Sequence, residues 1–372
     1  MAWNWTFDDW PDFTFDGEAV LALERTFLVA TGEVVGTIRH MDAEAREELR
    51  IQILSDEAIT TSRIEGEVLD RASVQSSLCR QFGLATHGLS SGRKERGIAE
   101  MMVDVYRCFA APLDDATLFR WHGMMLAGAR HLEIIGGYRT HAQPMQIVSG
   151  SLDRPKVHFQ APPSDRVPRE MARFVRWFND TGPRGPAEMP ALTRAALSHL
   201  YFESIHPFED GNGRIGRALA EKSLAQSIGH PSLIALSQTI ESNRKSYYDN
   251  LERYQRRLDV TGWLVYFGQT ILDAQNATLR RIGFILEKAR FRQAFGDMLN
   301  ERQHKVVARM FREGPDGFKG GMSAERYIAI THASRSTATR DLQDLVNKGA
   351  MRRTGERRYA RYTLAVDAPS AR

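Results

Sequence analysis

Apolar residues recur every three to four positions along most of this chain, which is the period of an amphipathic helix. Helical patterns of this kind cover residues 17–35, 42–66, 94–110, 192–205 and 217–229. Residues 136–163 depart from this period, because two short β-prone runs there flank turn residues, and this predicts a β-hairpin. The pattern therefore predicts a mainly α fold with a hairpin in its central part.

Three regions follow one another along the chain. Residues 1–95 are aromatic at the start and then helical, and a Gly/Ser-rich break at 87–92 ends this region. Residues 96–290 form the largest region, which is helical apart from the hairpin. Residues 296–365 show the order helix–helix–helix–hairpin, which predicts a small winged helix-turn-helix domain. We expect the aromatic start of the chain to pack against the helical core.

The composition narrows the class of protein. Of 372 residues, 42% are hydrophobic and 26% charged, so a sizeable buried core is expected. A formal net charge of +4 is small for this length and does not indicate a nucleic-acid-binding protein. Two cysteines exclude a disulfide framework. The chain begins with no basic and apolar leader and has no run of about 18 apolar residues. These features predict a soluble, cytoplasmic protein without a membrane partner.

The densest group of reactive residues lies in the segment HPFEDGNGRIGR, residues 206–217, between two helical patterns. Its glycines and asparagine predict a tight turn into a helix start, where free backbone N–H groups and the helix dipole favour an anion. Arg214 and Arg217 are three residues apart, so they share a helix face and both can reach one polyphosphate. Asp210 supplies a hard oxygen ligand suited to Mg²⁺. His206 can act as a base near neutral pH.

Each of these features has an ordinary structural explanation when it is taken alone. A DGNG sequence is commonly a simple turn, arginines on a helix face are commonly solvated, and most histidines are structural. Together they supply what phosphoryl or nucleotidyl transfer needs, because its catalysis rests on positioning and charge neutralisation. A metal-hydrolase interpretation of His206 and Asp210 is poorer, since no second group of ligands accompanies them.

The segment resembles the signature of the Fic family, HxFx(D/E)GNGRxxR, with every defining position present. The resemblance implies a Fic-type helical bundle core that transfers AMP from ATP to a Ser, Thr or Tyr hydroxyl of a target protein, with release of pyrophosphate. It implies that His206 is the base that deprotonates the hydroxyl, that Asp210 is the Mg²⁺ ligand and that Phe208 anchors the loop. It also implies that the nucleotide is bound by Gly211, Asn212, Gly213, Arg214 and Arg217. In this resemblance Arg217 contacts the γ-phosphate.

The predicted hairpin resembles the flap that lies beside the nucleotide in Fic proteins. The positions that match the usual flap pattern are Gly137, Arg139, Val148, Gly150, Pro162 and Pro163. The resemblance implies that an exposed edge of this flap holds a segment of the target as an added strand. It also implies that the residues near the nucleotide are Ile147, Val148, Ser149 and Gly150.

Two tyrosines follow where Fic proteins line the adenine pocket. The resemblance therefore implies nucleotide contacts by Tyr247 and Tyr248, although a Tyr-Tyr pair alone indicates core packing more often than a base platform. Family members often carry an asparagine eight residues after the first tyrosine, where this chain has Gln255. The side-chain amide is kept but its reach differs, so no role is assigned to Gln255.

Residues 43–65 predict a helix with Leu54, Ala58, Thr61 and Glu65 on one face. A carboxylate in the last turn is unfavourable against the helix dipole, so Glu65 can indicate an external cation. The segment TSRIEG that ends this helix, about 43–66, resembles the Fic inhibitory motif (S/T)xxxE(G/N). The resemblance implies that Glu65 pairs with Arg217, keeps the γ-phosphate from docking and inhibits the enzyme in cis.

The sequence of the C-terminal region, residues 296–365, does not decide whether this region binds DNA or a protein. Its third helix is expected to turn Arg335, Ser336, Thr339 and Arg340 outward and to bury Ala338, Leu342, Leu345 and Val346. Its hairpin, residues 351–362, carries five arginines and one glutamate, which suits DNA contacts and equally a protein-interaction module.

Two other functions stay open alongside AMP transfer. The same site could remove AMP from a modified protein, or the chain could be a DNA-binding regulator whose Fic domain only senses nucleotide. The sequence does not identify the target protein, the signal that relieves Glu65 or the oligomeric state, for which a homodimer is one alternative.

Overall fold

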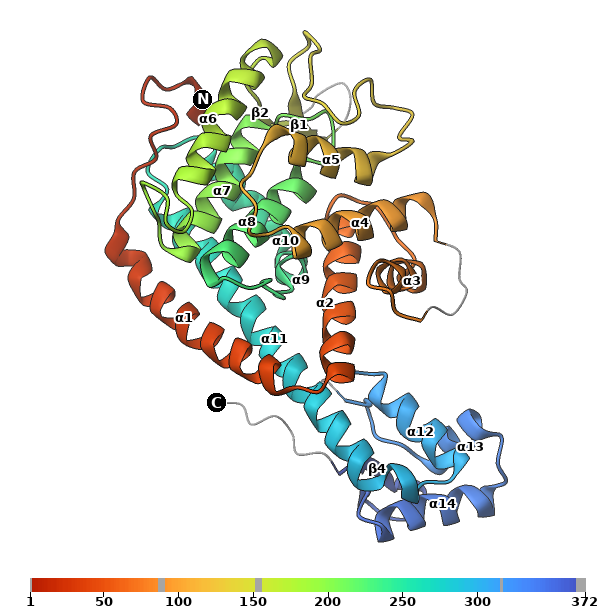
Figure 1. Ribbon diagram of the computed structural model, residues 1–372. Coiled ribbons are helices and arrows are strands. Elements are labelled where there is room, and N and C mark those ends of the chain that lie inside the picture. The colour runs from red at the N-terminus through yellow and green to blue at the C-terminus, as the bar shows by residue number, and fades with distance from the viewer. Residues whose placement is uncertain (1, 86–90, 151–155, 315–316, 366–372) are drawn as a thin grey trace. The chain divides into compact units, whose positions relative to one another are not determined.

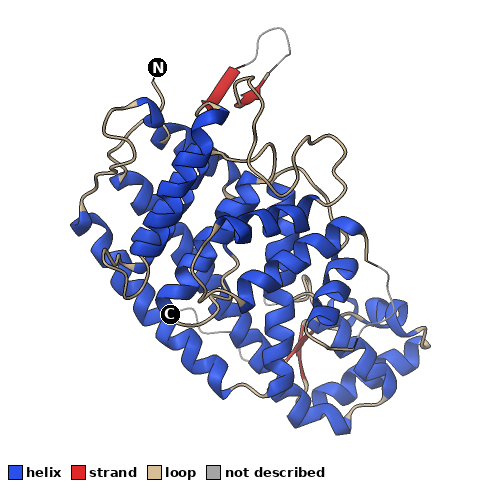
Figure 2. Cartoon of the chain, turned by 45° about the horizontal axis from the view of Figure 1, so that its top comes forward, coloured by secondary structure: helices blue, strands red, loops and turns tan. Residues whose placement is uncertain are grey.

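Helices form nearly all the regular structure of this protein. The computed structural model describes residues 2–85, 91–150, 156–314 and 317–365. Within these residues the strands are confined to two short hairpins (Figure 2), so the prediction of a mainly α fold is confirmed. Most of the predicted break at 87–92 and the tip of the predicted central hairpin, 151–155, lie outside the described residues. No described helix is both long and apolar enough to cross a membrane.

The chain forms two compact units. The larger unit comprises residues 1–35 and 50–276, and the smaller unit comprises residues 36–49 and 277–372. Three helices have residues in both units, and they are α1 (Gly17–His40), α2 (Ala43–Ile64) and α11 (Thr261–Phe295). The boundaries predicted from the sequence for three regions, 1–95, 96–290 and 296–365, remain predictions.

The larger unit holds the remaining N-terminal and central elements. Its short 3-10 helices are η1 (Asn4–Thr6) and η2 (Ser164–Arg166), and its strands are β1 (Gln146–Ser149) and β2 (Lys156–Gln160). Its α-helices are α3 (Arg71–Gln81), α4 (Arg93–Arg107), α5 (Asp115–Leu126), α6 (Val167–Asp180), α7 (Ala191–Ile205), α8 (Asn212–Ile228), α9 (Leu236–Ser242) and α10 (Arg244–Tyr254).

Helices α7 and α8 pack against each other at the centre of this unit (Figure 1). Every residue of α7 is buried, so its polar groups must find partners inside the protein. Arg194 donates to the carbonyl oxygens of Phe178, at 2.7 Å, and Ser223, at 3.2 Å. The carboxylate of Glu24 accepts two backbone N–H groups from the first turn of α7, where the helix dipole favours a negative charge.

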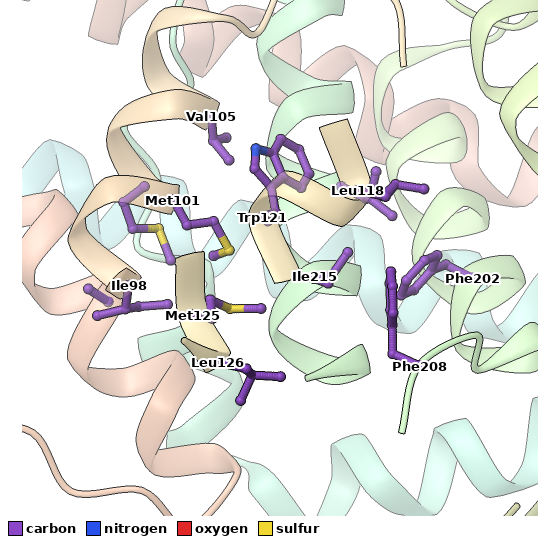
Figure 3. Close-up of a cluster of buried hydrophobic side chains, with 14 of the residues drawn as sticks. Ile98, Met101, Val105, Leu118, Trp121, Met125, Leu126, Phe202, Phe208 and Ile215 are labelled. Carbon is purple, nitrogen blue, oxygen red and sulfur yellow. The ribbon is translucent and has the colours of Figure 1, made fainter. Parts of the chain in front are cut away.

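The loop between α7 and α8 is anchored by Phe208. Its ring is fully buried and stacks on the imidazole of His122, with 4.4 Å between the ring centroids. In Figure 3 it lies beside Phe202 in the apolar cluster that Ile215 of α8 also lines. The side chain of Asn212 accepts from the Phe208 N–H at 2.9 Å and donates to its carbonyl oxygen at 2.8 Å. The prediction that Phe208 anchors the loop is confirmed.

The aromatic start of the chain packs against the helical core, as expected. Trp10 is buried, donates its indole N–H to Glu170 of α6 at 3.0 Å, and lies edge-to-face against Tyr201 of α7. The side-chain amide of Asn4 donates to Ser204 of α7 at 2.9 Å. The indole of Trp5 donates to the carbonyl oxygen of Gln160 in β2. This segment therefore braces both α7 and the central hairpin.

The smaller unit shows the predicted order of three helices and a hairpin. Its elements are η3 (Gly296–Met298), α12 (Glu301–Phe311), α13 (Ala324–Thr331), α14 (Arg335–Asn347), β3 (Met351–Thr354), η4 (Arg357–Tyr359) and β4 (Arg361–Leu364). Four residues of α14 were expected in the core. Three of them, Ala338, Leu342 and Leu345, are fully buried, whereas Val346 is only partly buried. Its four predicted outward residues are exposed. That this unit is a winged helix-turn-helix domain, and that it binds DNA, remain predictions.

We predict that Phe208→Ala destabilises the larger unit by about 3–5 kcal/mol, because it leaves a cavity beneath the loop. All six tryptophans lie in the larger unit, so urea unfolding followed by tryptophan fluorescence reports on that unit. Leu28→Ala is the control, because Leu28 is 59% exposed and its loss should change the unfolding free energy by less than about 0.5 kcal/mol. Equal effects of the two substitutions would contradict the anchoring role.

Candidate active site

His206 stands at the point where α7 ends. It is the C-cap residue of that helix and adopts the left-handed conformation, with φ of 51°. Its N–H donates to the carbonyl oxygen of Phe202 at 2.9 Å. Its own carbonyl oxygen accepts from Nε of the buried Arg139 at 2.8 Å. Arg139 also donates to the carbonyl oxygen of Pro162 at 2.6 Å, so it ties His206 to the segment that follows the flap. The sequence matched Arg139 to the flap pattern without indicating this contact.

The imidazole of His206 lies between α7 and the flap. Only 10% of the side chain is exposed, and its ring approaches that of Phe159 in β2, with 6.1 Å between centroids. Nδ1 lies 3.5 Å from a carboxylate oxygen of Glu203, one turn earlier on α7. Nδ1 is buried and forms no hydrogen bond to any residue that the structure describes. The catalytic assignment of His206 remains a prediction, and its place beside the flap is compatible with it.

The first turn of α8 carries the predicted anion site. Gly211 is the N-cap residue and has φ of 81°, a conformation that glycine adopts without strain. Asn212 uses its side chain to brace Phe208, so only its backbone is available to an anion. A Cβ atom added at Gly213 would collide with the carboxylate of Glu65. That carboxylate therefore lies directly against the helix start, where an anion is favoured.

Arg217 is held by the end of α2. Its guanidinium is buried and donates to Oγ1 of Thr61 at 2.7 Å, to the Thr61 carbonyl oxygen at 3.0 Å and to Oε1 of Glu65 at 2.8 Å. Burial alone would lower the pKa of Arg217, but the charge of Glu65 and its hydrogen bond raise that pKa above its usual value. The predicted pairing of Glu65 with Arg217 is present, and its inhibitory effect remains a prediction.

Arg214 is held by a carboxylate that the sequence interpretation missed. Its Nη1 lies 2.9 Å from Oε2 of Glu67, and its Nη2 lies 3.4 Å from Oδ1 of Asp210. Glu67 also pairs with Lys94 at 2.6 Å. The signal was present in the sequence EGE at 65–67, because a glycine with φ of 82° at position 66 lets both flanking carboxylates face α8.

Asp210 lies at the open side of the loop. Its carboxylate is 41% exposed, accepts from the Gly211 N–H at 2.5 Å and approaches His131 at 3.7 Å. Within the described residues no group of three or more His, Cys, Asp or Glu side chains could hold a metal ion. Asp210 can thus supply one carboxylate ligand, and Mg²⁺ commonly takes the rest from water and substrate phosphates.

The flap is a two-stranded antiparallel hairpin that pairs Gln146 with Gln160 and Ser149 with Lys156. All four residues of β1 are exposed, including the predicted nucleotide contacts Ile147, Val148 and Ser149. Gly150, the fourth predicted contact, has φ of 96° just before residues 151–155, which are not described. Nucleotide binding by these four residues remains a prediction.

The two tyrosines differ in their access to the site. Tyr247 is buried and its hydroxyl lies 2.8 Å from Nε2 of His199. Tyr248 is 37% exposed and donates to the carbonyl oxygen of Ile64, next to Glu65, at 3.4 Å. Tyr248 therefore lies at the surface beside the end of α2, and Tyr247 supports it from the core. Their nucleotide contacts remain predictions.

Comparisons with known proteins agree with this arrangement. Residues 112–224 match the Fic/DOC family, and residues 3–84 match a family described as a domain of unknown function (DUF4172). The fold is similar to that of a Fic family protein from Desulfovibrio desulfuricans G20, with a TM-score of 0.54 and 21% identity over 95% of this chain and 98% of that one. It is also similar to Fic-1 from C. elegans, with a TM-score of 0.51 and 20% identity over 73% of this chain and 75% of that one.

The chain carries a Fic/DOC family domain.

Curated relatives share only part of its length. The chain is 35% identical over 69 residues to a probable protein adenylyltransferase from Aquifex aeolicus (strain VF5), which is 18% of this chain and 20% of that protein. It is 32% identical over 126 residues to protein adenylyltransferase Fic from Drosophila melanogaster, which is 33% of this chain and 23% of that protein. Across these relatives, the matched part spans 15% to 26% of their length.

A pair of buried carboxyl groups lies one turn behind the Arg217 site of this Fic protein. Glu57 of α2 and Glu221 of α8 are both buried, and Glu57 accepts from the N–H and the hydroxyl of Ser237. Burial raises the pKa of Glu57. Burial and the adjacent charge of Glu57 raise the pKa of Glu221 well above its usual value. The folded protein therefore releases a proton from this pair at a higher pH than the unfolded chain does.

We predict that this pair makes the larger unit less stable as pH rises. A carboxyl group whose pKa is raised by folding stabilises the fold below its unfolded pKa, and that stability is lost as pH rises through the folded pKa. In Glu221→Gln, urea unfolding followed by tryptophan fluorescence should show higher stability than the wild type at pH 8 and a flatter pH dependence above about pH 5. Glu18→Gln, at the exposed start of α1, is the control. Parallel pH profiles for all three proteins would contradict the shared proton.

Proposed function

We propose that this Fic protein transfers AMP from ATP to a hydroxyl group of a target protein, with release of pyrophosphate. The observation that carries the proposal is that one short stretch, from the end of α7 to the first turns of α8, holds His206, Asp210, Arg214 and Arg217. Carboxylates are already paired to both arginines. Relatives named protein adenylyltransferase support the same reaction.

In the proposed reaction His206 is the general base. Its Nδ1 side is enclosed, so Nε2 accepts the proton of the incoming hydroxyl. The hydroxyl oxygen bonds to the α-phosphorus, and the bond from that phosphorus to the bridging oxygen breaks. Pyrophosphate leaves with the electron pair of the broken bond. Asp210 would hold Mg²⁺, which when bound neutralises charge on the phosphates.

The triphosphate would occupy the place that the Glu65 carboxylate takes against Gly213. Backbone N–H groups of the first turn of α8 favour an anion there, and Arg214 and Arg217 add two positive charges. The exposed strand β1 would hold a segment of the target as an added strand, which places a hydroxyl without a sequence-specific pocket. ATP and a protein with an accessible Ser, Thr or Tyr are thus the proposed substrates.

We further propose that two carboxylates restrain this site in cis. Glu65 pairs with Arg217 at 2.8 Å, where the γ-phosphate would dock. Glu67 pairs with Arg214 at 2.9 Å and therefore competes for the other phosphate contact. Removing a carboxylate partner leaves a buried guanidinium unpaired, which is costly until a phosphate takes its place. Each carboxylate thus weakens productive binding of ATP.

We predict that Glu65→Gly raises transfer of label from [α-³²P]ATP to protein by about 5- to 150-fold, the range of a typical coupling between two sites. In the same background His206→Ala should abolish transfer, because no base remains to accept the hydroxyl proton. Incubation in cell lysate followed by gel autoradiography measures both. Equal labelling by the wild type and Glu65→Gly would contradict autoinhibition by Glu65. If the double variant labels protein as fast as Glu65→Gly does, His206 is not the base.

We predict that Glu67→Gln raises AMP transfer less than Glu65→Gly does. The substitution keeps the size of the side chain but removes its charge. Because Arg214 is freed for phosphate, the KM for ATP should fall by about tenfold or less, the effect expected of one partly exposed ion pair. Glu95→Gln on α4 is the matched control, since that carboxylate accepts from the Asp70 N–H instead. A rise in KM for Glu67→Gln would instead identify Glu67 as a residue that positions Arg214 for catalysis.

A further inference from the structure

A buried carboxylate lies directly behind the proposed base. Glu203 is three residues before His206 on α7, so the two side chains share a helix face. Its Oε2 lies 3.5 Å from Nδ1 of His206, and the side chains are only 5% and 10% exposed. Nδ1 has no other partner in the part of the chain that the structure describes. Among those residues, the polar group placed to fix this face of the imidazole is therefore Glu203.

The position of the Glu203 carboxylate is set from its far side. Gly216 of α8 lies so close that a Cβ atom there would come within 2.6 Å of Oε1 of Glu203 and 3.1 Å of Nδ1 of His199. The side-chain amide of Gln255 donates to the carbonyl oxygen of Glu203 at 3.1 Å, which holds the last turn of α7. A larger residue at position 216 would push the carboxylate away, so this glycine is part of the arrangement.

The titratable and charged groups that face Glu203 are His199 and His206 of α7, Arg217 of α8 and, beyond His199, Tyr247 of α10. Burial lowers the pKa of His199, so His199 is neutral near pH 7. Burial alone would raise the pKa of Glu203, but its contact with His206 and the charge of Arg217 lower that pKa below its usual value. A full negative charge thus faces Nδ1 of His206, and the charge of Arg217 is already shared with Glu65.

We propose that Glu203 is a positioning residue that holds His206 with Nδ1 protonated and Nε2 free to accept the hydroxyl proton. This inference rests on the proposed AMP transfer. In the reacting enzyme the carboxylate, which lies 3.5 Å from Nδ1 here, would accept from Nδ1–H and so fix the tautomer and the ring orientation. It would also stabilise the imidazolium that forms when Nε2 takes the proton. Glu203 itself stays ionised throughout, and the proton remains on His206 until it passes to solvent.

The test uses the Glu65→Gly protein as the parent, so that transfer is measurable. Glu203→Gln keeps the size and the hydrogen-bonding reach of the side chain but removes its charge. We expect kcat to fall about tenfold or more, as a share of the effect of a general base, with little change in the KM for ATP. The acid limb of the pH–rate profile should move to lower pH, because the imidazolium has lost its counter-charge. Glu203→Asp keeps the charge at a longer distance and should shift the acid limb less than Glu203→Gln does.

Gly216→Ala provides a second variant that removes no titratable group. It displaces the carboxylate and should shift the acid limb in the same direction as Glu203→Gln. A kcat for Glu203→Gln within about twofold of the parent, or a loss of rate with an unmoved acid limb, would overturn the assignment. If the parent itself transfers no AMP, the proposed function fails. If the parent is active and the acid limb is unmoved, only the role of Glu203 fails.

Discussion

Two buried arginines at the start of α8 need anions, and this requirement governs the site. Arg217 is fully enclosed, and a guanidinium in such a place is costly unless it is paired. Glu65 and Glu67 supply the partners from the segment that follows α2. The same charges that suit the arginines to a triphosphate therefore also attract the chain's own carboxylates. The proposed affinity for the nucleotide and the proposed restraint of the site therefore have one physical origin.

The packing of α7 and α8 determines where those groups stand. Phe208 and the side chain of Asn212 hold the short loop that joins His206 to the first turn of α8. Arg139 connects the loop to the segment after the flap. Glycines at 213 and 216 let two carboxylates approach α8 closely, Glu65 at the anion site and Glu203 behind the proposed base. The proposed chemistry and the proposed inhibition thus both depend on the backbone of one helix.

Much of this arrangement could be predicted from the sequence, because local patterns encode it. Helical periodicity predicted the main helices, and the composition of the 206–217 loop predicted the tight turn into the start of α8. The anion site and the base in that loop stay predictions. The pairing of Glu65 with Arg217 followed from a resemblance, since nothing local shows which cation a carboxylate will meet. Contacts between segments far apart in sequence were missed, as with Glu67 and Arg214 or Glu203 and Gly216. Val346 was misplaced slightly because periodicity gives the face of a helix but not the depth of each residue.

The competition between carboxylate and phosphate for Arg217 is measured most directly by the difference between ATP and ADP binding. Isothermal titration calorimetry of the wild type and Glu65→Gly gives the ratio of the two dissociation constants in each protein. If Glu65 occupies the γ-phosphate site, the substitution should strengthen ATP binding by about tenfold relative to ADP, equivalent to about 1.4 kcal/mol. An unchanged ratio of ATP to ADP affinity would show that Glu65 and the γ-phosphate do not compete for Arg217, and it would contradict the inhibitory role of Glu65.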